Sequence, residues 1–89
     1  MKYIWVFHGA NARFTSGVFS TKATADQWIK KHKLTGLLTC YPLDTGCYDW
    51  AIESNFFEPK NESQITSEFI QKFTTASQEH YHYENGDDD

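Results

Sequence analysis

Apolar and polar residues alternate most clearly in one central stretch of the chain, residues 34–52. Two runs of apolar, β-branched or aromatic residues flank Pro42–Gly46, whose proline, aspartate and glycine favour a chain reversal. After the reversal, Tyr48, Trp50 and Ile52 recur at every second position. The pattern therefore predicts a β-hairpin over Leu34–Ile52.

A second hairpin is predicted at the start of the chain. Tyr3–His8 is apolar on both alternating faces, as in a strand covered on two sides. The segment Gly9–Ala12 supplies turn residues, and Arg13–Phe19 returns as the partner strand. The first two elements are thus expected to be paired strands.

Apolar residues at helical spacing predict two helices. Ser20 or Thr21 caps the first helix, which runs to about Lys33 and has lysines in its last turn. Asn61 or Ser63 caps the second helix. Its expected buried stripe consists of Ile65, Phe69, Ile70, Phe73 and Ala76.

The predicted element order is ββαββα, which indicates an α+β fold. Two hairpins and two helices favour a four-stranded, mainly antiparallel sheet with both helices packed on one face. The length of 89 residues allows one domain, which we expect over residues 1–84, followed by an acidic disordered tail, 85–89. The aromatic content of 17% supplies the apolar area that so short a chain needs.

Charge is divided unevenly along the chain, whose net charge is −4. Residues 1–43 hold six basic residues and one acid, whereas residues 44–89 hold two lysines and eleven acids. Solvated faces with an acidic tail explain this layout, and so does an acidic surface that meets a basic protein. Nucleic acid is not an expected partner, because Lys and Arg do not interleave with the aromatic residues.

The two cysteines and the first residues of the chain indicate the cellular location of the protein. Cys40 and Cys47 are expected to be free thiols, which fits a reducing environment. The apolar run after Lys2 is too short for a signal-peptide core or a membrane span. We therefore expect a cytoplasmic protein with no membrane partner.

The sequence contains no catalytic signature and no cofactor motif. Cys40, Cys47, His32 and Asp49 are residue types used in nucleophilic catalysis, but no local catalytic signature surrounds either cysteine. We therefore expect no enzyme activity, no catalytic residue and no cofactor.

A metal site is not assigned either, although the tail offers weak candidates. His80, His82 and Glu84 would project to one side if the tail were extended. Their spacing, and that of Cys40 and Cys47, lacks the pairing of structural zinc motifs.

Several short segments together resemble a family of small, uncharacterised bacterial domains. The segments are WVFHG at 5–9, ARF at 12–14, SGVF at 16–19, Ala25 with WI at 28–29, LTG at 34–36, LT at 38–39, YP at 41–42 and YDWA at 48–51. The resemblance implies no activity, cofactor or site. By analogy, some small acidic bacterial proteins of this kind are immunity proteins that neutralise secreted toxins.

The leading functional hypothesis is a non-catalytic protein-binding domain, such as a toxin-neutralising immunity protein or a similar inhibitor, that meets a basic toxin through its acidic surface. The predicted partner-binding residues are Asp44, Asp49, Glu53, Tyr48, Trp50, Glu79 and Glu84. The aromatic pair would serve as anchors if exposed. The alternatives are a small-ligand or metal-responsive regulatory domain and a homodimer formed through an open sheet face.

Overall fold

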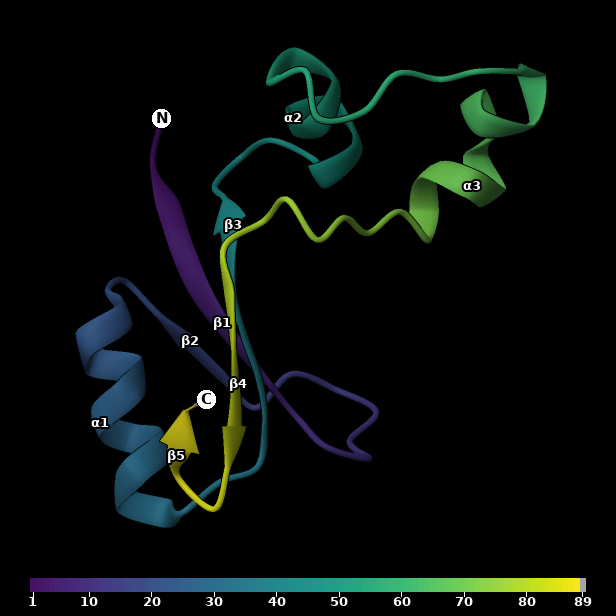
Figure 1. Cartoon of the computed structure of the whole chain (residues 1–89). Helices are drawn as coiled ribbons and strands as arrows, with labels where there is room; N and C mark the ends of the chain where they lie inside the picture. The colour runs from purple at the N-terminus through teal and green to yellow at the C-terminus, as the bar shows by residue number, and fades with distance from the viewer. Residues whose placement is uncertain (89) are drawn as a thin grey trace.

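A five-stranded antiparallel sheet forms the body of the protein, and a computed structural model describes residues 1–88. The strand order is β2-β1-β3-β4-β5, and α1 packs on one face of the sheet (Figure 1). The elements are β1 Tyr3–Gly9, β2 Gly17–Phe19, α1 Lys22–His32, β3 Gly36–Pro42, α2 Cys47–Glu53, the 3₁₀ helix η1 Glu62–Ile65, α3 Ser67–Gln71, β4 His80–Glu84 and β5 Asp87–Asp88.

The first hairpin and the first helix form in the predicted regions, but β2 is Gly17–Phe19 rather than the predicted Arg13–Phe19. The strands β1 and β2 pair antiparallel, with Val6 opposite Val18. Thr21 caps α1 by accepting a hydrogen bond from the Thr24 amide at 3.1 Å. Lys33 ends α1 in the left-handed conformation, with φ of 53°.

The main core lies between α1 and the sheet. Ala25 and Ile29 of α1 are fully buried against Phe7, Leu38 and Tyr83, which come from the three central strands. Five half-buried apolar side chains surround this cluster: Trp5, Phe19, Trp28, Leu34 and Tyr81. The core therefore joins one helix face to one face of β1, β3 and β4.

The predicted hairpin over Leu34–Ile52 is wrong in its second half. Its first half is β3, but Cys47–Glu53 is the helix α2 rather than a strand. A two-residue period puts Tyr48 and Trp50 on one face but Ala51 on the other, so the burial of all three does not fit a strand with one covered face. Asp49 suits the first turn of a helix. The left-handed turn at Asp44, with φ of 62°, leads the chain away from the sheet before α2 begins.

The strand that completes the sheet comes from the C-terminal segment instead. β4 pairs with β3, placing Leu38 opposite Tyr81 and Leu37 opposite His82. The segment predicted as a disordered tail, 85–89, continues this structure. Asn85 and Gly86 form a turn and β5 pairs with β4, while Asp89 lies outside the described residues.

The predicted second helix is also shorter than its apolar stripe indicated. Asn61 caps η1 and Thr66 caps the five-residue α3. Ile65 and Ile70 of the stripe are 59% and 39% exposed. We call residues 43–76, which contain α2, η1 and α3, the α2–α3 lobe. It lies beyond the end of the sheet rather than on the face that α1 covers (Figure 1).

The predicted fold class is confirmed: the protein is α+β with an antiparallel sheet. The sheet has five strands instead of four, and α1 alone packs on its face. The α2–α3 lobe lengthens the molecule, which measures 45 × 28 × 21 Å. Within residues 1–88, no helix is both long enough and apolar enough to span a membrane.

Candidate functional site

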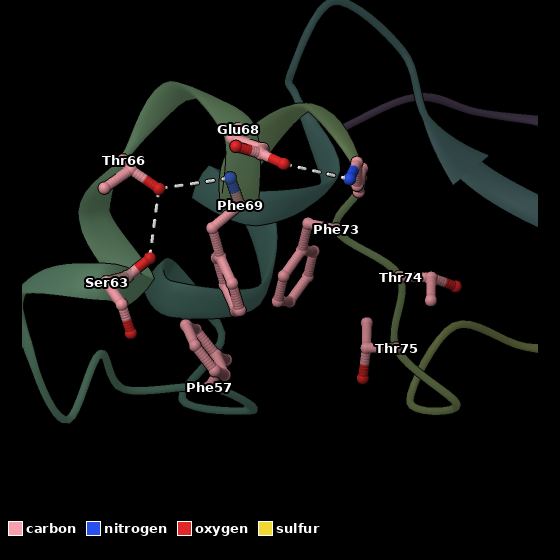
Figure 2. Close-up of a pocket in the computed structure, with 9 residues that line it drawn as sticks. Phe57, Ser63, Thr66, Glu68, Phe69, Phe73, Thr74 and Thr75 are labelled. Atoms are coloured by element: carbon pink, nitrogen blue, oxygen red, sulfur yellow. Dashed lines mark hydrogen bonds and ion pairs between the residues drawn. The ribbon is translucent and has the colours of Figure 1, made fainter.

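An aromatic hollow opens on the surface of the α2–α3 lobe. The rings of Phe57, Phe69 and Phe73 lie side by side along it (Figure 2), with ring centroids 5.0 to 6.1 Å apart. The hollow has a volume of about 640 Å³ and is open to solvent. The hydroxyl-bearing residues that line it are Ser63, Thr66, Thr74 and Thr75.

Local hydrogen bonds hold the walls of this hollow in place. The Thr66 hydroxyl accepts a hydrogen bond from the Phe69 amide at 3.2 Å and donates one to the Ser63 carbonyl at 3.0 Å. Lys72 pairs with Glu68 at 3.2 Å along α3 (Figure 2). The rings are therefore positioned by their own short elements.

Tyr48 of α2 packs against the three phenylalanine rings from inside the lobe. Its ring centroid lies 5.5 to 6.3 Å from those of Phe57, Phe69 and Phe73. Its hydroxyl donates a hydrogen bond to the Gln64 carbonyl at 2.7 Å. The hollow is thus tied to α2 through a single buried tyrosine.

The lobe also carries the predicted acidic residues of the second half of the chain. Asp49 and Glu53 are exposed and four residues apart on α2, so they share one helix face. Asp44 is exposed in the turn before α2. The structure therefore groups these three carboxylates around one end of the molecule.

Part of this negative charge is left without an internal partner. Glu58 and Glu68 pair with Lys60 and Lys72. Among residues 1–88, the remaining carboxylates of the lobe make no ion pair: Asp44, Asp49, Glu53 and Glu62. These groups are available to a positively charged partner.

The two predicted aromatic anchors are buried, so they do not face a partner. Tyr48 and Trp50 are each 8% exposed. The Trp50 indole N–H donates to the Tyr3 hydroxyl at 3.3 Å, which joins α2 to the start of β1. Phe56 lies nearby and is 53% exposed; its ring is tilted by 46° against that of Trp50, with the centroids 5.4 Å apart.

The last two predicted acids lie near opposite ends of β4. Glu79 lines a hollow of about 400 Å³ together with Trp50 and Phe56, so it borders the lobe. It also accepts a hydrogen bond from the Tyr81 hydroxyl at 2.5 Å. Glu84 ends β4, about 17 Å away along an extended strand. The structure therefore joins Glu79 to the lobe but not Glu84.

The weak metal candidates lie on the sheet face opposite α1. β4 is extended, so His80 and His82 project to the same side, with ring centroids 5.5 Å apart. The Nδ1 of His80 donates to the Gln78 carbonyl at 2.7 Å. In the described part of the chain, no group of three or more His, Cys, Asp or Glu residues is arranged to hold a metal ion.

Neither cysteine is activated as a nucleophile. Cys40 and Cys47 are free and half-buried. Burial raises the pKa of both thiols, and the negative charge of Glu79 adds to the rise at Cys40. Since the thiolate is the reactive species, both groups are poor nucleophiles near neutral pH.

Sequence reasoning treated the phenylalanines of the lobe as part of the core and so missed the hollow. The available signal was the shortness of the polar-bounded segment 55–76, which holds six large apolar residues: Phe56, Phe57, Ile65, Phe69, Ile70 and Phe73. A lobe this small cannot enclose them all.

A protein-family model matches residues 4–89 and is described as Domain of unknown function (DUF7710). The chain belongs to this family. The match confirms the predicted membership of a family without an assigned activity, and it covers both the sheet and the α2–α3 lobe of this DUF7710 domain. Comparisons with curated proteins and with solved structures give no significant match.

Proposed function

We propose that this DUF7710 domain is a non-catalytic protein-binding domain that takes a basic protein on its α2–α3 lobe, as an inhibitor or a toxin-neutralising immunity protein does. The observation that carries the proposal is the combination of an open aromatic hollow with unpaired carboxylates on the same lobe. The hollow suits an apolar or guanidinium side chain, and the carboxylates suit the basic residues around it.

The electrostatics favour fast, salt-sensitive association. Asp44, Asp49 and Glu53 are exposed, so their charges act through solvent on an approaching partner. Exposed charges of this kind mainly raise the association rate and select against acidic partners. An inhibitor of a basic enzyme needs both properties.

The amount of exposed surface supports a protein partner. The accessible surface is 6263 Å², whereas a monomeric protein of 10.4 kDa typically exposes about 5,400 Å². The radius of gyration is 14.4 Å, compared with about 12 Å for a compact domain of this length. The α2–α3 lobe protrudes beyond the end of the sheet, so it presents surface on which a partner can dock.

The proposal includes a cytoplasmic location. The free thiols of Cys40 and Cys47 support it, because reducing compartments preserve free thiols.

Affinity capture with charge variants tests the proposed function. The bait is the tagged full chain, offered to an extract of the organism that encodes it and eluted with rising salt. We expect one basic protein to bind the wild type and to elute at moderate salt. The double variant Asp49→Asn, Glu53→Gln should lose it.

The matched control changes two acids outside the lobe. The variant Glu84→Gln, Asp87→Asn removes the same amount of charge at the turn between β4 and β5, away from the aromatic hollow. It should retain the partner. Equal capture by both double variants would remove α2 from the binding surface.

A further inference from the structure

One face of the sheet has no helix over it. Because side chains alternate along a strand, the residues between those packed against α1 project to the opposite side. Figure 1 shows α1 on one side of the strands. We define the open face as Ile4, Val6 and His8 of β1, Val18 of β2, Leu37, Thr39 and Tyr41 of β3, and His80 and His82 of β4.

The register brings these side chains into one continuous surface. Val6 lies between Val18 and Thr39, and Thr39 is followed by His80 on β4. In the next row, Leu37 lies between His8 and His82. A shallow hollow of about 500 Å³ runs along this surface. The aliphatic residues of this surface are Ile4, Val6, Val18 and Leu37; Val18 is 63% exposed and the other three are partly exposed.

Apart from Glu84, which projects to the same side at the end of β4, the strands β1 to β4 carry no Lys, Arg, Asp or Glu side chain on the open face. The nearest carboxylates on the same side, Glu84 and Asp87, lie at its corner, where β4 turns into β5. A basic protein would find counter-charge only at this corner of the open face, and a nucleic acid would find no basic residue. A second, identical face meets it without charge repulsion.

We propose that the open face binds a second copy of this chain, so that two sheets pack face to face about a two-fold axis. Aliphatic residues of facing sheets interdigitate about 10 Å apart, and a two-fold axis makes each face its own complement. A stable interface of this kind takes roughly 800 Å² from each partner.

The acidic lobe is unsuited to this self-association and is left free by it. The unpaired carboxylates of one lobe would repel those of a second lobe. The lobe lies beyond the end of the sheet, so packing of the two sheets leaves it uncovered (Figure 1). The homodimer would therefore present two α2–α3 lobes at once. The inference does not depend on the proposed function of the lobe.

Sedimentation equilibrium over a range of protein concentrations tests the homodimer. We expect the wild-type mass to approach twice the 10.4 kDa of the chain as concentration rises. Thr39→Lys places a charge at the centre of the open face, where the monomer can still expose it to water. This variant should stay at 10.4 kDa with an unchanged far-ultraviolet circular dichroism spectrum.

Gln27→Lys is the matched control, because it adds the same charge at an exposed position of α1. It should dimerise like the wild type. A wild-type mass of 10.4 kDa at every concentration overturns the proposal and leaves the open face to a different protein. Persistence of the dimer in Thr39→Lys overturns it as well.

The two proposals fail separately. The Asp49→Asn, Glu53→Gln variant is expected to remain dimeric, and Thr39→Lys is expected to retain the basic partner. For the wild-type chain, a monomer that still captures a basic protein contradicts the homodimer alone, and a dimer that captures no basic protein contradicts the function of the lobe alone.

Discussion

The hydroxyl of Tyr83 in β4 donates a hydrogen bond to the carboxylate of Asp26 in α1 at 2.8 Å. The two residues are 57 positions apart in sequence, and Tyr83 is 3% exposed. The bond connects α1 to β4, the strand that the C-terminal segment adds to the sheet. It therefore links the end of the chain to the main core.

Replacing Tyr83 with phenylalanine should lower stability and change its alkaline pH dependence. The lost hydrogen bond to a carboxylate costs about 1.5 to 3 kcal/mol of unfolding free energy. Burial, followed by the bond to Asp26 and its charge, raises the pKa of Tyr83 far above the ordinary value of 10.0. Urea denaturation of both proteins between pH 7 and pH 11 measures the difference.

The sign of that pH dependence follows from the neutral phenol. The folded state holds the neutral form, whereas the unfolded phenol ionises near pH 10. The contribution of Tyr83 is therefore complete below about pH 10 and declines above it. Tyr83→Phe should show a shallower alkaline loss, and an identical slope in both proteins would contradict this role.

Two truncations should show that β4 is required for folding and that β5 is not. Removal of residues 87–89 deletes β5 and the pair between Lys30 and Asp88 at 3.8 Å, which is partly exposed and should cost less than about 1 kcal/mol. Removal of residues 80–89 deletes β4 and uncovers Leu38. We expect the longer truncation to unfold, as measured by circular dichroism and thermal melting.

Gly36 is required where β1 and β3 begin to pair. A Cβ at this position would press against the His8 carbonyl oxygen and lie 2.8 Å from the Gly9 Cα. Gly36→Ala should therefore cost about 1 to 3 kcal/mol of unfolding free energy. Gly46→Ala is the control, because its nearest contact would be 3.7 Å away. Equal denaturation midpoints for the two variants would contradict the close approach.

Filling the aromatic hollow should abolish partner binding without unfolding the protein. Thr74 is exposed and lines the hollow, so Thr74→Trp places an indole over the phenylalanine rings. The captured basic protein should no longer be retained, while the thermal midpoint stays within a few degrees of the wild-type value. Undiminished capture would show that the hollow is not part of the contact.

Local signals were enough to predict α1. The cap at Thr21, the helical spacing of Ala25 and Ile29, and the lysines near the end all lie within the helix itself. The pairing of the first two strands was predictable for a similar reason, because they are neighbours in the chain, but the loop between them, residues 10–16, is longer than the predicted Gly9–Ala12 turn.

The fourth strand could not be predicted from local pattern. Tyr48, Trp50 and Ile52 fit a strand as well as a short helix, so periodicity over seven residues did not decide between them. The decision lies in long-range pairing, since Leu38 is opposite Tyr81, 43 positions later. That pairing depends on tertiary packing rather than on the segment itself.

The candidate site was predicted in part. Charge in the sequence located Asp44, Asp49 and Glu53 on an exposed surface, because unpaired acids remain in water. Tyr48 was predicted to be an aromatic anchor for a partner if it is exposed. It is buried instead, and its ring packs against the three phenylalanine rings. The hollow arises from the packing of three short elements, which no spacing in the sequence specifies.

The most direct test of the proposed function is the dissociation constant of the captured basic protein, measured by calorimetric titration at low and high salt. We expect Asp49→Asn, Glu53→Gln to weaken binding by about 10-fold to 100-fold at low salt and to reduce the salt dependence. Glu84→Gln, Asp87→Asn should bind like the wild type, because both acids lie outside the lobe. Equal dissociation constants for all three proteins would contradict a partner held by the acidic lobe.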